Sequence, residues 1–315
     1  VSPRCIGRCH TGLVDRMLYG GRMNTITQAA LWMSGAILSF TSMAIAGRAV
    51  SLELDTFEIM MYRSFVGVVI VLIVSGVSGT WNQITTRSMG THLARNAAHF
   101  TGQNLWFYAL TMIPLAQVFA LEFTSPLWVM ILSPLILGEK LTKTRVQAAI
   151  LGFGGILIVT RPGATPISPG LVAAAASAIG FAFSIMLTKR LTRTETITCI
   201  LFYLTVMQAI FGIICAGWDM DITLPSAKAA PWLVLIGCAG LLAHFCLTTA
   251  LRIAPATVVI PIDFFRLPLI AVIGMVLYGE PLEMAVFLGA LAIFSGNYLN
   301  ILSETRKAQE TGRAP

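Results

Sequence analysis

The chain has 315 residues, of which 56% are hydrophobic and 11% are charged, and its mean hydropathy is +0.80. A soluble globular domain carries about 25% charged residues, so this composition excludes a soluble fold and indicates a polytopic membrane protein. The net charge of +7 comes from Lys and Arg in short loops and tails, so we expect membrane lipid and not nucleic acid as the partner of this chain.

Ten hydrophobic segments follow one another along the chain. They cover residues 29–47, 59–79, 97–113, 115–137, 146–160, 170–188, 197–217, 232–251, 256–278 and 284–302. The third and fourth are joined at Ile113-Pro114, and the eighth and ninth at Ala254-Pro255, where proline cannot continue the preceding helix. Segments of this kind predict an all-α integral membrane protein with ten transmembrane helices.

The second half of the chain repeats the first at an offset of 141 residues, without a gap. Pairs related in this way include Ala109 and Ala250, Pro114 and Pro255, Glu122 and Asp263, Gly138-Glu139 and Gly279-Glu280, and Gly155 and Gly296. Each half holds five spans, an odd number, so the second half crosses the membrane in the opposite sense. We therefore predict two inverted five-helix repeats, residues 29–160 and 170–302, with a substrate site at their interface.

The distribution of Lys and Arg predicts the orientation. With the N-terminus inside, sixteen of these residues lie in inner loops and tails, and only Arg48, Arg161 and Lys228 lie outside. The tails, residues 1–28 and 303–315, are therefore expected in the cytoplasm, and the protein in the plasma (inner) membrane.

Residues 1–22 differ from the rest and are interpreted as an extension or a misplaced start before Met23. Their Cys5, Cys9 and His10 have a spacing one residue too long for haem attachment and lack further ligands, so we expect no metal and no cofactor. The other cysteines lie in or beside apolar spans, where they are expected to behave as small hydrophobic residues. They are Cys199, Cys215, Cys238 and Cys246.

Several motifs of this chain occur together in one known family. They are Tyr62-Arg63-Ser64-Phe65, residues 107–116, Ser125-Pro126-Leu127, Leu137-Gly138-Glu139, Gly152-Phe153-Gly154-Gly155 and Thr160-Arg161-Pro162-Gly163. In order, spacing and duplication, residues 29–302 resemble the EamA-type ten-helix branch of the drug/metabolite transporter superfamily. The resemblance implies two inverted halves that move a small metabolite by alternating access. Similar subgroups include S-adenosylmethionine uptake carriers, riboflavin importers, and amino-acid and drug exporters, which these motifs do not separate.

Four charged side chains fall inside the predicted spans: Glu122, Asp263, Arg63 and Arg266. From the helical rise, each acid lies about 10 Å from the end where its span begins, and Arg63 lies near the depth of Glu122. Ionisable groups at bilayer depth are costly, so they indicate a functional site by default. The acids are expected to bind substrate cations or protons, and the arginines to bind anionic groups. The structural alternative is two ion pairs, Arg63–Glu122 and Asp263–Arg266, that only hold helices together.

Uncharged and weakly basic groups complete the predicted site. His244 is a candidate proton relay, with a hydrogen-bonded core histidine as the alternative. Gln103 and Asn104 either line the cavity or bond a neighbouring helix. His99 is expected at the inner membrane edge, solvated by interfacial water.

Glu139 and Glu280 are interpreted as interfacial markers. Four prolines, Pro126, Pro134, Pro261 and Pro268, are expected to interrupt spans four and nine, which therefore face the substrate.

Catalytic and nucleotide-binding signatures are missing from the sequence. It has no nucleophile–base set, no HExxH or GxSxG motif and no GxxxxGK[ST] loop, which argues against an enzyme and an ATP-driven pump. We predict a gradient-driven secondary transporter of a small organic metabolite, with S-adenosylmethionine, riboflavin, amino acids and related compounds as candidates. Coupling to protons and assembly as a homodimer are further expectations. The alternative is a non-transporting membrane scaffold or partner subunit.

Overall fold

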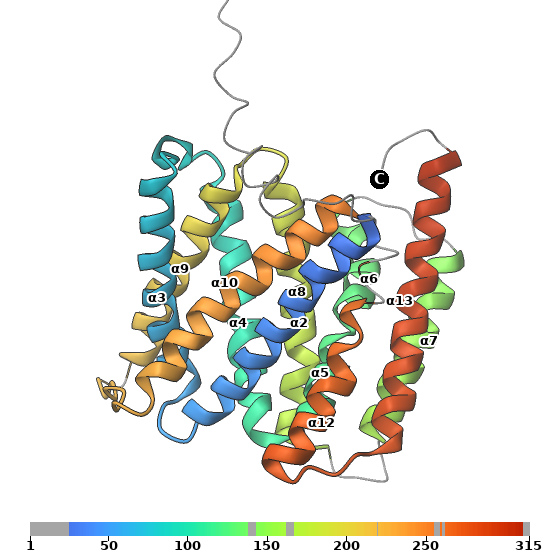
Figure 1. The fold of residues 1–315 in the computed structure, drawn as a ribbon. Helices are drawn as coiled ribbons and strands as arrows, with labels where there is room; N and C mark the ends of the chain where they lie inside the picture. Colours follow the sequence, from blue (N-terminus) through green and yellow to red (C-terminus); the bar gives the residue numbers. More distant parts are fainter. Residues whose placement is uncertain are drawn as a thin grey trace, which may run out of the picture.

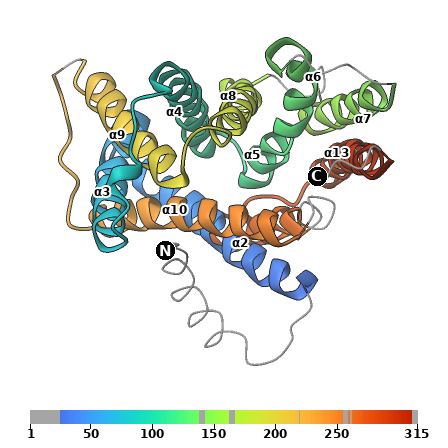
Figure 2. The same ribbon diagram turned by 90° about the horizontal axis from the view of Figure 1, so that it is seen from above.

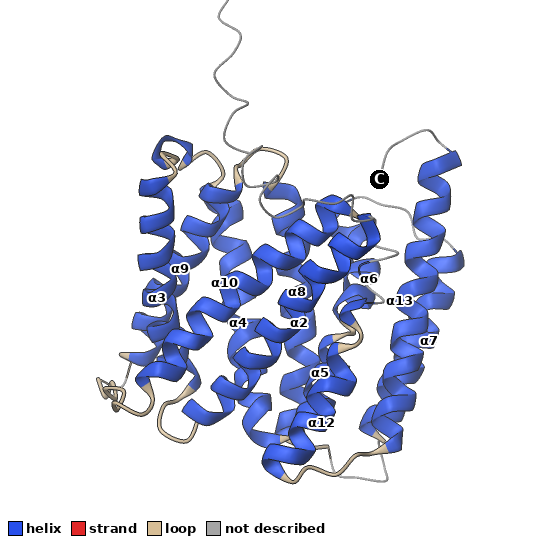
Figure 3. Cartoon of the chain, in the orientation of Figure 1, coloured by secondary structure: helices blue, strands red, loops and turns tan. Residues whose placement is uncertain are grey.

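The computed structural model describes residues 25–137, 143–161, 167–218, 220–254, 259 and 262–310, which are helices and loops (Figure 3). The helices are α2 (Thr25–Val50), α3 (Thr56–Val77), α4 (Met89–Met112), α5 (Leu115–Glu122), α6 (Ser125–Leu137), α7 (Lys143–Thr160), α8 (Pro169–Leu191), α9 (Ile197–Ala216), α10 (Ala230–Ile253), α12 (Arg266–Tyr278) and α13 (Met284–Glu310), with a 3₁₀ turn at Trp81–Gln83. Predictions for Cys5, Cys9, His10, Glu139, Pro255 and Pro261 fall outside the described residues.

Seven stretches of the described helices are long and apolar enough to cross a membrane. They are Ile26–Val50, Thr56–Val77, Leu115–Leu132, Pro169–Leu191, Ile197–Ala216, Ala230–Leu247 and Met284–Ser303. The helix α4 runs through the bundle beside them but carries buried polar side chains such as Arg95 and Gln103 (Figure 1). Its lower hydropathy therefore reflects a surface that faces the protein interior and not lipid.

The helix bounds repeat at the offset of 141 residues found in the sequence. The helices α4 and α10 begin and end at related positions, and so do α6 and α12. The helices α3 and α9 begin at related positions, and so do α7 and α13. The helices α2 and α8 end at related positions. The structure thus confirms an all-α membrane fold built from two five-helix repeats.

Contacts between the repeats follow a pseudo-twofold axis. The helix α2 packs along α10 in the same way as α8 packs along α4, while α3 pairs with α9 and α7 with α13 (Figure 2). The beginning of α2 and the end of α13 lie at the same end of the bundle, at the top of Figure 1. The two repeats are therefore inverted with respect to each other.

Glycines bring α7 and α13 into backbone contact. A Cβ at Gly155 would lie 2.5 Å from the carbonyl oxygen of Gly289, and a Cβ at Gly289 would lie 2.6 Å from the carbonyl oxygen of Gly155. The related contact, between Gly296 and the carbonyl oxygen of Ala148, would be 2.6 Å. Small residues allow such close approach in membranes, where packing drives the association of helices.

Two predicted spans are broken at related positions. The helix α5 ends at Glu122 and α6 begins at Ser125, and in the second repeat a turn at residues 264–265 separates Asp263 from α12. At the first break the carbonyl oxygen of Phe123 accepts a hydrogen bond from Nδ2 of Asn297 on α13, at 2.9 Å. A broken helix is tolerated at membrane depth when such partners satisfy its free backbone groups.

The prolines explain the breaks only in part. Pro126 and Pro268 lie in the first turns of α6 and α12, where proline leaves no hydrogen bond unmade. Pro134 lies inside α6, which continues through it, so the prediction that Pro134 interrupts the span is wrong.

Candidate functional site

The predicted acids meet at a single arginine. Nη2 of Arg266 lies 3.1 Å from Oε1 of Glu122 and 3.4 Å from Oδ2 of Asp263. The Arg266 side chain is only 5% exposed, whereas those of Glu122 and Asp263 are 18% and 20% exposed. Nε1 of Trp106 donates a hydrogen bond to the other oxygen of Glu122, at 2.8 Å. We call Glu122, Asp263 and Arg266 the charge triad; it joins the two repeats at their helix breaks.

Aromatic rings enclose the arginine of the charge triad. Cζ of Arg266 lies 4.8 Å from the ring centre of Phe40, and 5.0 Å from the ring centres of Phe119 and Phe123. Cation–π contacts of this kind favour a cation that is largely removed from water. In the described residues, Oδ1 of Asp263 and Nε of Arg266 are buried without a hydrogen-bond partner. The charge triad therefore retains polar atoms available to a ligand or water.

A second polar cluster lies on α3, α4 and α10. Arg63 donates a hydrogen bond to Oε1 of Gln103, and both line a cavity together with His99 and His244. The ring centres of the two histidines are 6.2 Å apart. The cavity has a volume of about 40 Å³, which holds a few waters and no metabolite. This cavity, as the structure has it, is therefore too small for the substrate of a metabolite carrier.

The partner of Arg63 differs from the sequence-based alternative. That alternative pairs Arg63 with Glu122 and Asp263 with Arg266. The structure contains the second pair, but it joins Glu122 to Arg266 and Arg63 to Gln103. His99 is 5% exposed and lines the cavity, so its predicted interfacial position is also wrong.

Phe40 connects the two clusters. Its ring lies under Arg266 and also packs edge-on against His244, with ring centres 5.6 Å apart. Asn104, in contrast, donates to the carbonyl of Phe100 within its own helix and does not line the cavity. The sequence indicated that Trp106 supplies aromatic surface near the charges, but not its hydrogen bond to Glu122 or the role of Phe40. One available signal was the match of Phe40 to Phe181 at the repeat offset, since Phe181 packs against His99.

One end of the bundle is closed by an ion pair between the repeats. Arg48 pairs with Glu280, and its Nε and Nη2 donate to the carbonyls of Leu110 and Ile113 at 2.6 and 2.7 Å. Oε2 of Glu280 accepts from the backbone N–H of Leu115 at 2.9 Å. We call this the Arg48–Glu280 clamp. Glu280 thus has a structural role at the end of the bundle, and the sequence did not identify its partner, Arg48.

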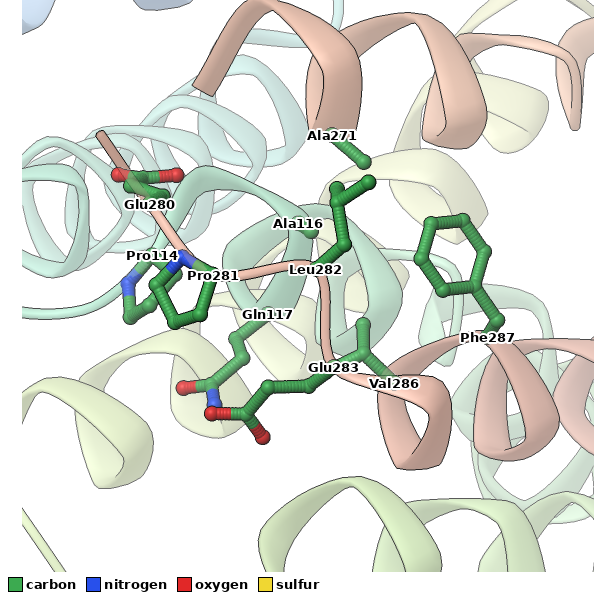
Figure 4. A pocket seen from close by; sticks show the side chains of 10 residues that line it. All are labelled: Pro114, Ala116, Gln117, Ala271, Glu280, Pro281, Leu282, Glu283, Val286 and Phe287. Atoms are coloured by element: carbon green, nitrogen blue, oxygen red, sulfur yellow. The ribbon is translucent and has the colours of Figure 1, made fainter. Parts of the chain in front are cut away.

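Further contacts reinforce the same end. The backbone N–H of Thr223 donates to Glu58 at 2.5 Å, and that of Ser226 donates to Glu53 at 2.5 Å. The hydrogen bonds from Ser226 lower the pKa of the Glu53 carboxyl. Beside the Arg48–Glu280 clamp, Figure 4 shows a pocket with Pro114 and Pro281 in its lining; its volume of about 10 Å³ is too small for a metabolite. This end is closed in the structure.

The fold and site define a class of protein, because inverted repeats with broken helices around buried charges are the architecture of secondary transporters. Residues 27–161 and 168–302 each match the EamA-like transporter family. The chain belongs to this family.

Relatives of known name agree with this assignment. The riboflavin transporter of Brucella anthropi is 32% identical over 68% of this chain and 77% of that protein. The riboflavin transporter of Vibrio cholerae is 28% identical over 90% and 95%, and the S-adenosylmethionine uptake transporter of Rickettsia bellii is 25% identical over 87% and 94%. A crystal structure that is 18% identical shares the fold, with a TM-score of 0.60 over 89% of this chain and 98% of that chain.

These findings confirm the predicted function class. The chain is a multi-pass membrane transporter of a small organic metabolite and not an enzyme. The three relatives named above are all called transporters, so they favour transport over the alternative of a membrane scaffold.

Proposed function

We propose that this chain imports a metabolite with a planar heteroaromatic ring system, with riboflavin as the first candidate and S-adenosylmethionine as the second. Flavin and adenine rings are both flat, fused nitrogen heterocycles. The charge triad at the two helix breaks, with aromatic rings around Arg266, is the observation that carries the proposal. Flat rings stack on such side chains, and the free polar atoms of the triad supply directional contacts.

The charge balance favours a neutral substrate. The charge triad has a formal charge of −1, and Arg63 and the buried Arg95 add +2 near His99 and His244, so the buried groups carry no net negative charge that would call for a cation. A strongly cationic substrate would need at least one acid released from Arg266. This is the reason for placing riboflavin before S-adenosylmethionine, although relatives carry both names.

The residues of the two clusters have different proposed roles. Glu122, Asp263 and Arg266 bind the polar groups of the substrate, and protonation of one acid would release Arg266 and couple transport to protons. Arg63, Gln103 and His244 line the path on the other side of Phe40. Asn104, which is 7% exposed with a free buried Oδ1, contributes only if α4 rearranges.

The orientation is part of the proposal. The excess of Lys and Arg in inner loops supports an orientation with both termini in the cytoplasm and the Arg48–Glu280 clamp at the outer face of the inner membrane. The structure then represents a state closed toward the outside. Import requires this clamp to open.

Uptake by purified protein in liposomes tests the proposal. We expect saturable uptake of labelled riboflavin that unlabelled S-adenosylmethionine inhibits weakly, and that an uncoupler reduces. Glu122→Gln and Asp263→Asn should each lower uptake at least tenfold at equal protein content. Asp221→Asn, the same change as Asp263→Asn at an exposed acid of the loop between α9 and α10, is the matched control and should transport normally. Full uptake by Glu122→Gln/Asp263→Asn would contradict the site, and uptake of S-adenosylmethionine alone would reverse the order of substrates.

A further inference from the structure

Three potential metal ligands meet at the end of the bundle opposite the Arg48–Glu280 clamp. His92 lies in the first turn of α4, Glu195 in the loop between α8 and α9, and Cys199 in the first turn of α9. The imidazole, carboxylate and thiol ligand atoms all lie within 4.8 Å of one another. Because His92 belongs to the first repeat and the other two to the second, the cluster joins the repeats.

The cluster is buried but incompletely hydrogen-bonded. His92 and Cys199 are both 0% exposed. In the part of the chain that the structure describes, Nδ1 of His92 and Oε1 of Glu195 are buried and have no hydrogen-bond partner. Buried polar atoms are nearly always paired, so the unpaired carboxylate oxygen of Glu195 calls for an additional bound species, while Nε2 of His92 is the ring nitrogen that faces Sγ of Cys199.

The surrounding contacts hold the ligands in place. Oγ1 of Thr85 donates to the second oxygen of Glu195 at 2.7 Å, and the ring of Tyr203 packs on His92 with centres 4.6 Å apart. The side chain of Thr196 caps the start of α9 by accepting from the backbone N–H of Cys199.

The geometry fits a tetrahedral ion after a small adjustment. Nε2 of His92 lies 3.9 Å from Sγ of Cys199, whereas Zn–N and Zn–S bonds at the tetrahedral angle would place these atoms about 3.6 Å apart. A thiolate and a carboxylate neutralise the charge of a divalent ion. Sulfur and nitrogen ligands select Zn²⁺ or Co²⁺ over Mg²⁺ and Ca²⁺.

We propose that His92, Glu195 and Cys199 form a binding site for Zn²⁺ that holds the two repeats together at this end. Binding displaces the proton of the Cys199 thiol to solvent, and water completes the coordination. The sequence-based expectation of no metal is replaced by this proposal. Under the proposed transport function, a bound ion would inhibit alternating access by preventing this end from opening.

Cobalt titration of the purified full-length protein, without a histidine tag, tests the site independently of transport. Thiolate–Co²⁺ coordination gives an intense near-ultraviolet absorption band. The background carries Cys5→Ala and Cys9→Ala, because those thiols would also bind cobalt. We expect the band in this background and in the further variant Cys246→Ala, which removes another buried cysteine. Cys199→Ala should abolish the band, and His92→Gln should weaken the affinity for Co²⁺ at least tenfold.

A band that persists in Cys199→Ala, or no band in the background protein, would overturn the proposal. The transport arm measures riboflavin uptake with and without micromolar Zn²⁺, followed by a chelator. We expect Zn²⁺ to inhibit the background protein at least threefold and to leave Cys199→Ala unaffected. A cobalt band without any uptake would support the metal site and count against the proposed substrate, so the two failures are distinguishable.

Discussion

Arg266 is the residue on which the two acids of the site depend. It is the most buried member of the charge triad, and it contacts both carboxylates and three aromatic rings. Its counterpart in the first repeat is Ser125, so a single arginine, which has no arginine counterpart in the first repeat, contacts both symmetry-related acids. The site is therefore asymmetric in its cation and symmetric in its anions.

The three members of the triad should differ in their contribution to stability. Arg266→Gln leaves two close, partly buried acids without a counter-ion, and removing one partner of a buried pair costs about 3–5 kcal/mol. Glu122→Gln or Asp263→Asn leaves Arg266 with one acid, so we expect a cost of about 1–3 kcal/mol. Thermal unfolding of the purified variants in detergent measures the order. Equal or reversed effects would show that Arg266 does not bridge the acids.

Residue-level prediction from the sequence identified the two acids but not all of their partners. Glu122 and Asp263 occupy related positions in the two repeats, and in the structure both acids contact one arginine. The helical rise does not specify which face of α3 points to which neighbour, so Gln103 was not recognised as the partner of Arg63. The cluster of His92 with Glu195 and Cys199 escaped notice because it joins segments about a hundred residues apart.

At the scale of the helices, glycine determines how closely the paired repeats approach. The helices α7 and α13 touch through Gly155 and Gly289, whereas Gly154, the neighbour of Gly155, faces open space. The same helix therefore offers both a test position and its control.

Gly155→Ala should destabilise the protein and Gly154→Ala should not. The added methyl group at Gly155 would lie 2.5 Å from a backbone oxygen, so the helices must separate, at a cost of about 1–3 kcal/mol. At Gly154 the methyl group meets no atom, and alanine favours the helix by about 0.5–1 kcal/mol. Melting temperatures in the same detergent measure both effects. A normal melting temperature for Gly155→Ala would contradict the close backbone contact.

Helix existence was predictable and the position of the breaks was not. Ten apolar segments were visible in the sequence, but the prolines suggested interruptions at Pro126 and Pro134. The observed break precedes Pro126, at Phe123, because Asn297 from a distant helix supplies the hydrogen bond that the open backbone needs. A tertiary contact of this kind leaves no local signal.

At the scale of the molecule, the Arg48–Glu280 clamp connects elements from both repeats. It contacts the end of α2, the junction of α4 and α5, and the segment after α12. The nearby pair of Arg161 and Glu283 has side chains that are 39% and 32% exposed, compared with 15% and 12% in the clamp. Water screens the exposed pair more strongly, so the clamp is the stronger closure.

Glu280→Gln should therefore open this end of the molecule. We expect a cysteine introduced as Ala116→Cys, beside the clamp, to react faster with a membrane-impermeant maleimide, because a change of about 1.4 kcal/mol in the equilibrium alters the open fraction about tenfold. Glu283→Gln is the matched acid-to-amide control and should change the rate less. Unchanged labelling in Glu280→Gln would remove the clamp from the closing mechanism.

The overall architecture was the most predictable feature, since the repeat of 141 residues implied five helices per half and their inversion. The gapless alignment of the helix bounds has a further consequence. Each backbone position in one repeat has a counterpart in the other, as α6 and α12 show end to end. Wherever the described parts of the two repeats differ in conformation, exchanging those conformations residue by residue defines a second arrangement of the same helices. Each repeat of such a chain thus carries, in its own backbone, the alternative conformation of the other repeat.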